Sequence, residues 1–335
     1  MLTLRLMRGK LAPAEYLYYR LWDPRLSMEQ KRAFVGKQAQ HRMHVACNDR
    51  HWYQVAADKI LFHTIMAGAA LPAPAVLAIT QPGRTLRGAQ TLDRPEEITA
   101  FLRNPAVYPL FAKEAAGKYS LNVISADAYD AATDSLVLFG GGSRPVLETA
   151  QSMSDGSGFI LQPRLRPDRQ IAEQFGPRLW SLRLLVLLRP DGPHIHRAVA
   201  KIATGGNPAD NYWRAGNMLG AIDRSTGRIA SCVRGTGAQL TRDEAHPDTG
   251  QVINGFGIPQ WSELCDLTRQ AASVFPGIRT QSWDVALTDQ GPVFLEVNFG
   301  GDLNLARLAY GEGVLDEDYR AHLRQCGFKL ERGAH

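Results

Sequence analysis

Asp284, Glu296 and Asn298 are the residues of this sequence whose types and spacing most directly indicate chemistry. Two carboxylates and one amide oxygen form the kind of oxygen ligand set that hard cations such as Mg²⁺ prefer. Two carboxylates held close together repel each other unless a cation or a shared proton lies between them. The alternative is an acidic strand face that is simply hydrated. We interpret the three residues as a site for a divalent metal, Mg²⁺ in the first place and Mn²⁺ as a second candidate.

A β-hairpin over residues 281–298 is expected to bring these three residues together. Two apolar runs, WDVAL and PVFLEV, flank the turn residues 289–291. A three-residue loop with glycine last suits a type I turn followed by a left-handed residue. Such a loop pairs Thr288 with Pro292, and it therefore places the two carboxylates opposite each other. Because side chains alternate along a strand, the asparagine shares their face.

Basic residues on other predicted strands can face the same place. Residues 178–206 are typical of a second hairpin, in which Arg183 and Lys201 alternate with apolar neighbours and can point into one cleft. Arginine suits a planar contact with several donors. Lys113 ends a further apolar run and precedes a loop of small residues, 115–120. The alternative for Lys113 is a strand-end lysine in solvent.

Three patterns resemble those of a known enzyme superfamily. The pattern D…G-x-x-x-x-E-x-N over residues 284–298 resembles the metal-binding end of an ATP-grasp enzyme. The H-P-D-T-G segment 246–250 and the D-N…G segment 210–216 resemble elements of one branch, the ATP-grasp proteins associated with sugar-transfer and exopolysaccharide gene clusters. The resemblance covers residues 26–325. The sequence departs from the pattern in the loop 115–120, which has a single glycine, and at position 217, where asparagine replaces a glycine.

The resemblance implies roles for individual residues. Contacts with ATP are implied for Lys113, Gly117, Lys118, Ser120, Leu161, Gln162, Arg183 and Asn211. Metal binding is implied for Asp284, Glu296 and Asn298, and catalytic charge stabilisation for Arg183 and Lys201. Contacts with the substrate are implied for His246 and Asp302. The alternative for His246 is a histidine that stabilises its own loop.

An α+β ATP-grasp fold, with two α+β subdomains that clamp ATP, is also implied. We expect a helical N-terminal region at 1–75, a first, lid-bearing subdomain at 76–162, and a second subdomain with the metal site at 163–335. A capping box at residues 27–30 is expected to start a surface helix that continues through VGKQAQHRMHVA.

The implied activity is ligation with ATP and Mg²⁺. A substrate carboxylate is activated as an acyl phosphate and joined to an amine, in the synthesis of a polysaccharide or a peptide-like metabolite. Two alternatives stay open. One is a kinase-like ATP-grasp phosphotransferase that acts on a hydroxyl, and the other is a nucleotide-binding protein without catalysis.

Composition, charge and cysteine spacing bear on the other classes of protein that the chain could belong to. The chain has 335 residues and a net charge of +5, but no basic run with interleaved aromatic residues, so we expect no nucleic-acid partner. No apolar run approaches the roughly 18 residues of a membrane span. The four cysteines are scattered without a C-x-x-C pair, from which we expect a reduced, cytoplasmic protein with neither a disulfide framework nor a zinc site.

Overall fold

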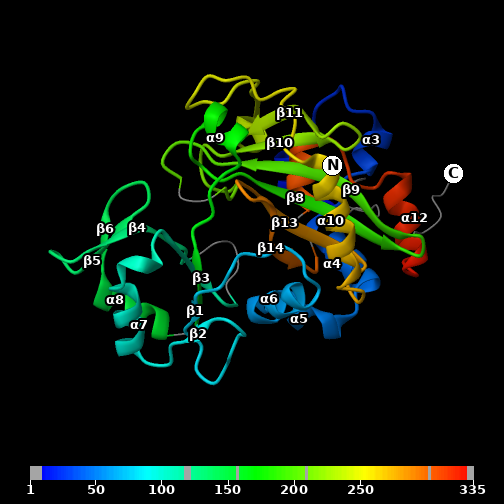
Figure 1. Cartoon of the computed structure of the whole chain (residues 1–335). Helices are drawn as coiled ribbons and strands as arrows, with labels where there is room; N and C mark the ends of the chain where they lie inside the picture. The colour runs from blue at the N-terminus through cyan, green and yellow to red at the C-terminus, as the bar shows by residue number, and fades with distance from the viewer. Residues whose placement is uncertain (1–9, 117–121, 156–157, 208–209, 301–302, 330–335) are drawn as a thin grey trace.

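The computed structural model describes residues 10–116, 122–155, 158–207, 210–300 and 303–329. These residues form an α+β fold with two seven-stranded sheets, which lie in a smaller and a larger lobe (Figure 1). Within the described residues, every helix is too short or too polar to cross a lipid bilayer.

The larger sheet contains both predicted hairpins. Its strand order is β12-β11-β10-β9-β8-β13-β14, and neighbouring strands run antiparallel. The strands are β8 (Ser181–Arg189), β9 (Gly192–Ile202), β10 (Met218–Asp223), β11 (Arg228–Arg234), β12 (Thr241–Arg242), β13 (Thr280–Thr288) and β14 (Gly291–Asn298).

Helices cover both faces of the larger sheet. Alternate residues of β8 enter different clusters: Leu184 packs with α6 (Lys59–Gly68) and α10 (Trp261–Ser273), whereas Leu185 packs with α4 (Lys37–Cys47) and α12 (Glu317–Gln325). Side chains that alternate along a strand point to opposite faces, so these clusters mark the two faces. A further helix, α11 (Leu303–Tyr310), packs against β9, β10 and β11. The sheet is therefore buried on both sides.

The smaller sheet has the order β2-β1-β7-β3-β4-β5-β6. Its strands are β1 (Ala78–Ile79), β2 (Gln90–Thr91), β3 (Leu110–Glu114), β4 (Ile124–Asp130), β5 (Ser135–Leu138), β6 (Ser143–Pro145) and β7 (Phe159–Pro163). The helices α7 (Pro95–Leu102) and α8 (Val146–Ser154) pack on it around a second apolar core. After β7 the chain forms α9 (Arg169–Phe175) and enters the larger lobe.

The N-terminal region differs from the predicted surface helix. The capping box is confirmed, because the Ser27 hydroxyl accepts from the backbone N–H of Gln30 at 3.1 Å. The helix it starts, α3 (Met28–Arg32), is short, and the chain then leaves the helical path before α4. The prediction of an exposed helix is wrong for α4, whose Met43 and Cys47 are buried. The other α-helices of the described residues are α2 (Pro13–Tyr18) and α5 (Tyr53–Ala57), and the short 3-10 helices are η1 (Arg50–Trp52), η2 (Pro105–Val107) and η3 (Gly237–Gln239).

The predicted turn of the β13–β14 hairpin is also corrected. Thr288 pairs with Gly291, so the loop has two residues and not three. A bulge at Leu295 then adds one residue to β14, because Val285 pairs with Phe294 while Asp284 pairs with Glu296. The shorter loop and the bulge compensate, and the predicted pairing of the two carboxylate residues is confirmed.

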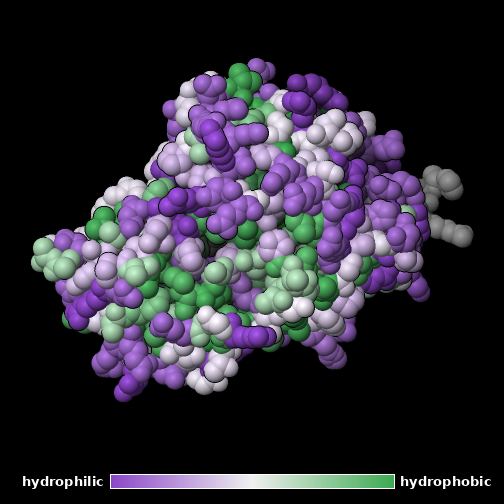
Figure 2. All heavy atoms as spheres, in the orientation of Figure 1, coloured by the Kyte–Doolittle hydropathy of each residue, from purple (hydrophilic) through white to green (hydrophobic). Residues whose placement is uncertain are grey.

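On the face viewed in Figure 2, hydrophilic residues predominate. Hydrophobic residues gather where, in Figure 1, the smaller lobe lies beside α5 and α6.

Candidate active site

Asp284 lies at the centre of a charged cluster on the larger sheet. It pairs in register with Arg183 of β8, and both side chains point to the face that α4 and α12 cover further along the sheet. The Arg183 guanidinium forms a two-point contact with the carboxylate, in which Nη2 donates to Oδ2 at 2.9 Å and Nε lies against Oδ1. The Nζ of Lys201 donates to the same Oδ2 at 3.0 Å. Two predicted catalytic cations and one predicted metal ligand are thus in direct contact.

The charges around Asp284 decide its protonation state. Burial acts to raise the pKa of Asp284, but the positive charges of Arg183 and Lys201 outweigh it, so the pKa is lowered from 3.8. Burial likewise acts to lower the pKa of Lys201, yet the carboxylates of Asp210 and Asp284 leave that pKa raised. All members of the cluster are therefore charged at neutral pH.

Asp210 is a second carboxylate at this cluster that the sequence reasoning did not select. Its Oδ1 lies 3.5 Å from the Nζ of Lys201, and its Oδ2 accepts from the hydroxyl of Ser181. The neighbouring Asn211, which the resemblance placed at the nucleotide, has its side-chain oxygen on the backbone N–H of Trp213 at 3.1 Å. A D-N pair does not reveal from sequence which of its members faces the site.

Glu296 and Asn298 lie side by side on β14, as predicted. The Asn298 amide donates to Oε1 of Glu296 at 3.1 Å. The Glu296 charge acts on two lysines from the smaller lobe and the N-terminal region, Lys113 and Lys59. Lys113 also donates to the carbonyl of Leu295 at 3.4 Å, so β3 of the smaller lobe meets the bulge of β14 directly.

Burial lowers the pKa of both lysines despite that carboxylate. For Lys113 the pKa is lowered to about 8, with burial as the largest cause and Glu296 acting in the opposite direction. For Lys59 the direction is the same and the cause is again burial. Lys59 is 7% exposed, and the sequence reasoning missed it. A local signal is Asp58, which caps α6 and fixes the position of its first residue.

Gln162 of β7 is buried beside a histidine. Its Nε2 lies 3.1 Å from Nε2 of His63 on α6. Burial lowers the pKa of His63 to about 3, with Lys113 and Lys59 adding to the shift, so the imidazole is neutral. A neutral imidazole nitrogen accepts from the Gln162 amide nitrogen, so this contact does not use the amide oxygen. Leu161 lies next to it in the same central strand.

The other predicted residues lie in different surroundings. Gly117, Lys118, Ser120 and Asp302 lie outside the described residues. His246 is buried and its ring stacks on Trp180, with ring centroids 6.4 Å apart and planes 14° apart. Its Nδ1 accepts from the backbone N–H of Asp248 at 3.3 Å. That contact helps to hold the H-P-D-T-G loop in place.

The donor set of the cluster fits a hard divalent cation. Asp284, Glu296 and Asn298 offer carboxylate and amide oxygens from two adjacent strands. One of them is already engaged, because Asp284 is in contact with two cations. A metal ion would meet the side chains of Glu296 and Asn298 next to each other. It would compete with Arg183 and Lys201 for the carboxylate of Asp284.

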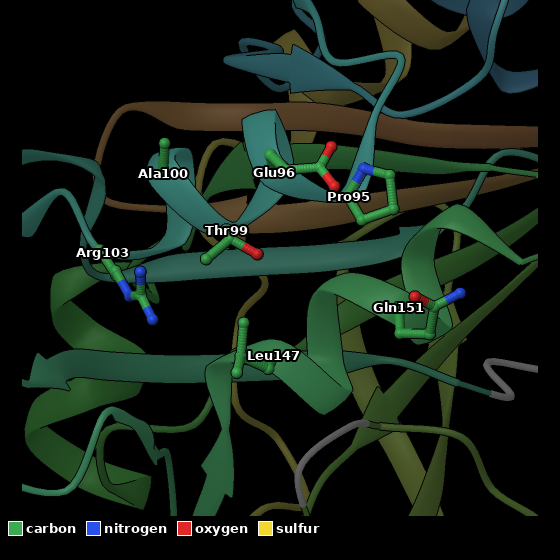
Figure 3. Close-up of a pocket in the computed structure, with 7 residues that line it drawn as sticks. All are labelled: Pro95, Glu96, Thr99, Ala100, Arg103, Leu147 and Gln151. Atoms are coloured by element: carbon green, nitrogen blue, oxygen red, sulfur yellow. The ribbon is translucent and has the colours of Figure 1, made fainter.

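A separate hollow lies on the smaller lobe. It measures about 450 Å³ and is lined by α7 and α8, with Thr99 and Arg103 on one side and Leu147 and Gln151 on the other (Figure 3). Its lining residues belong to elements other than those that hold the charged cluster.

Comparisons with solved structures found several chains of partly similar structure and low sequence identity. One is an N5-carboxyaminoimidazole synthase from Aspergillus clavatus, solved with ADP and 5-aminoimidazole ribonucleotide. The alignment covers 79% of this chain and 51% of the synthase, at 10% identity and a TM-score of 0.41. A D-alanine–D-alanine ligase from Helicobacter pylori aligns over 83% of this chain and 62% of its own, at 10% identity and a TM-score of 0.43. An L-amino acid ligase from Bacillus licheniformis aligns over 76% and 43%, at 13% identity and a TM-score of 0.37.

The chain spans less than two thirds of each of these solved structures. A search of curated proteins gave no match. A family model described as sugar-transfer associated ATP-grasp matches residues 145–321, which include the strands of the charged cluster and the β13–β14 hairpin. Because that match covers more than half of the sequence, the chain belongs to the sugar-transfer associated ATP-grasp family.

Proposed function

We propose that this protein is an ATP-dependent ligase that activates a carboxylate as an acyl phosphate and joins it to an amine. The observation that carries the proposal is the contact of Arg183 and Lys201 with Asp284, beside Glu296 on the next strand. Membership of the ATP-grasp family supports it.

The cations of this cluster suit a polyphosphate. Arg183 and Lys201 contact Asp284 on the larger sheet, and the charge of Glu296 acts on Lys59 and Lys113. Charge interactions are stronger here than in water because burial lowers the local dielectric constant. Phosphate oxygens can replace Asp284 as the partner of its two cations, which releases carboxylate oxygens for a metal ion.

Asp284, Glu296 and Asn298 would hold the metal. Mg²⁺ bound there supplies positive charge that stabilises the phosphate oxygens during transfer. Gln162, whose amide oxygen is not used in the contact with His63, suits the exocyclic amino group of adenine.

The proposed reaction has two steps. An oxygen of the substrate carboxylate attacks the γ-phosphorus of ATP, the bond to the β–γ bridging oxygen breaks, and ADP leaves. The amine nitrogen then attacks the acyl carbon, inorganic phosphate leaves, and the nitrogen loses a proton. Arg183, Lys201 and Lys113 stabilise the charge on the transferred phosphoryl group, and no side-chain nucleophile is required.

The test is a screen for Mg²⁺-dependent ADP release over amino acids and sugar acids, followed by mass analysis of the product. An amide product with one ADP per bond supports the ligase. A phosphorylated hydroxyl product would replace it with a kinase-like phosphotransferase. Binding of ATP without turnover under any substrate pair would favour a nucleotide-binding protein without catalysis.

Because of Lys113, we expect the affinity of the site for ATP to depend on pH. Since burial lowers the pKa of Lys113 to about 8, its ammonium is charged below that pH and neutral above it. A bound phosphate favours the charged form, so affinity for a non-hydrolysable ATP analogue is expected to fall as the pH rises from about 7 to about 9. Calorimetric titration at constant ionic strength measures this.

Two variants make the pH test specific. Lys113→Met should bind more weakly at neutral pH and lose most of the slope. Lys37→Met removes an exposed lysine of α4 and should keep both the affinity and the slope. A slope that persists unchanged in Lys113→Met would mean that another group titrates.

A further inference from the structure

Three side chains that can ligate a metal, from distant parts of the sequence, meet on the face of the larger sheet that α4 and α12 cover. Cys47 is the last residue of α4, His322 lies in α12, and Cys326 follows the end of α12. The two sulfur atoms and one ring nitrogen all lie within 4.8 Å of one another. The Sγ of Cys326 is 3.6 Å from Nε2 of His322.

The cluster is enclosed by the protein. His322 is fully buried and Cys47 is 4% exposed, while Cys326 is half-buried at the helix end. The hydroxyl of Thr280, on the strand that carries Asp284, lies 3.0 Å from Nε2 of His322.

These separations match those around a tetrahedral zinc ion. Zn–S bonds of about 2.3 Å and Zn–N bonds of about 2.0–2.1 Å put sulfur and nitrogen ligands roughly 3.5 Å apart and two sulfur ligands roughly 3.8 Å apart. The observed distance from Cys326 to His322, 3.6 Å, agrees, and the third ligand is within reach. Small side-chain adjustments therefore suffice to admit the ion.

We propose that Cys47, His322 and Cys326 bind one Zn²⁺ per chain, with the fourth position taken by water or by the Thr280 hydroxyl. Two thiolates and one neutral imidazole balance the charge of the ion, which burial of the site requires. The sequence alone predicts no zinc site, because the cysteines form no C-x-x-C pair. Ligands that only the fold brings together leave no such pattern.

The position of the site indicates a structural role. Asn48, next to Cys47, donates from its side chain to the carbonyls of Thr280, at 3.3 Å, and of Phe299. It also accepts from the backbone N–H of Thr280 at 2.9 Å. Zinc would thus hold α4 and α12 against β13 at the open end of the β13–β14 hairpin, where the chain enters at Thr280 and leaves at Phe299. Removal of the ion is expected to lower the melting temperature.

The test uses the full chain, purified without a metal-affinity tag and then titrated with Co²⁺ and Zn²⁺. Co²⁺ in the site should give a near-ultraviolet thiolate charge-transfer band that saturates at one equivalent and is displaced by Zn²⁺. Co²⁺ at the carboxylates gives no such band, because no sulfur ligand is present there. Cys326→Ser, at a half-buried helix end, should fold and lose the band. Its Zn²⁺ affinity should fall by more than the roughly 10–100-fold that loss of an outer-shell partner costs.

The matched control is Cys265→Ser, which changes a buried cysteine of α10 outside the cluster and should keep the band. An absent band in the reduced wild-type protein would overturn the proposal. A band equally strong in Cys326→Ser would do the same. So would a Cys47–Cys326 disulfide in the protein as purified under reducing conditions.

Discussion

Replacing Glu296 with glutamine is expected to reduce Mg²⁺-dependent ADP release by at least about 100-fold while the fold is retained. Glutamine keeps the shape of the side chain and an oxygen that can accept from Asn298, at present 3.1 Å from the Glu296 carboxylate. It removes the negative charge that a hard cation requires. Steady-state ADP release measured over a range of Mg²⁺ concentrations, with circular dichroism as a check on folding, gives the result.

The structure changes the stability expected of this variant. If two carboxylates faced each other without cations, loss of one would relieve repulsion and leave the protein at least as stable. Asp284 already has two cationic partners, and the charge of Glu296 favours the ammonium forms of Lys59 and Lys113. Glu296→Gln is therefore expected to lower the melting temperature slightly in the absence of ligands.

Glu114→Gln is the matched control for that experiment. Glu114 lies at the end of β3, also acts on Lys59, and accepts from the Asn122 amide at 2.6 Å, but it is not part of the hairpin. It should keep most of the ADP release. Near-normal turnover in a folded Glu296→Gln protein would remove Glu296 from the metal site.

The hairpin shows what local sequence patterns can predict. The pairing of Asp284 with Glu296 follows from the lengths of two apolar runs and their turn, and it is confirmed. The predicted turn is one residue too long, and the bulge at Leu295 restores the predicted pairing of Asp284 with Glu296. A bulge of this kind depends on neighbours outside the hairpin, here including the Lys113 ammonium of the smaller lobe on the Leu295 carbonyl, so sequence alone does not reveal it.

The residues that were missed come from other parts of the chain. Lys59 is the first residue of a helix, a position where lysine is usually in solvent, and His63 lies on an apolar helix where a buried histidine looks like any core residue. Lys59 and His63 reach the site only because α6 packs against β7 and β14 in the fold. The zinc ligands are a further case, because Cys47 and Cys326 are adjacent only in the fold.

Replacing Asp284 with asparagine is expected to lower the free energy of unfolding by about 3–5 kcal/mol, because it leaves two buried cations without their main partner. The side chains of Asp284 and Lys201 are each 8% exposed, and that of Arg183 is 16% exposed. Asp210, at 3.5 Å from Lys201, offsets only part of the loss. Urea unfolding at neutral pH measures the difference.

The same ion pairs predict the behaviour of the wild-type protein in acid. The pKa of Asp284 is lowered in the fold, so its contribution is fully present above the ordinary value of 3.8 and is lost as the pH falls through the folded value. Asp284→Asn has no such group to protonate. The difference in the free energy of unfolding between the wild-type protein and Asp284→Asn should therefore become smaller below about pH 4.

A variant without any of the three charges separates stability from function. Replacing a buried group of ion pairs with apolar side chains of similar volume is often neutral or stabilising. Arg183→Met, Lys201→Met and Asp284→Leu together should therefore restore much of the stability that Asp284→Asn loses, while Asp210 keeps its contact with the Ser181 hydroxyl. The restored protein should still bind no ATP analogue, because the cations that we propose face the phosphates are gone. A single Asp284→Asn variant as stable as the wild type would mean that the two cations find other partners, and the close pairing seen in the fold would then contribute little. Full ATP affinity in the triple variant would place the nucleotide elsewhere.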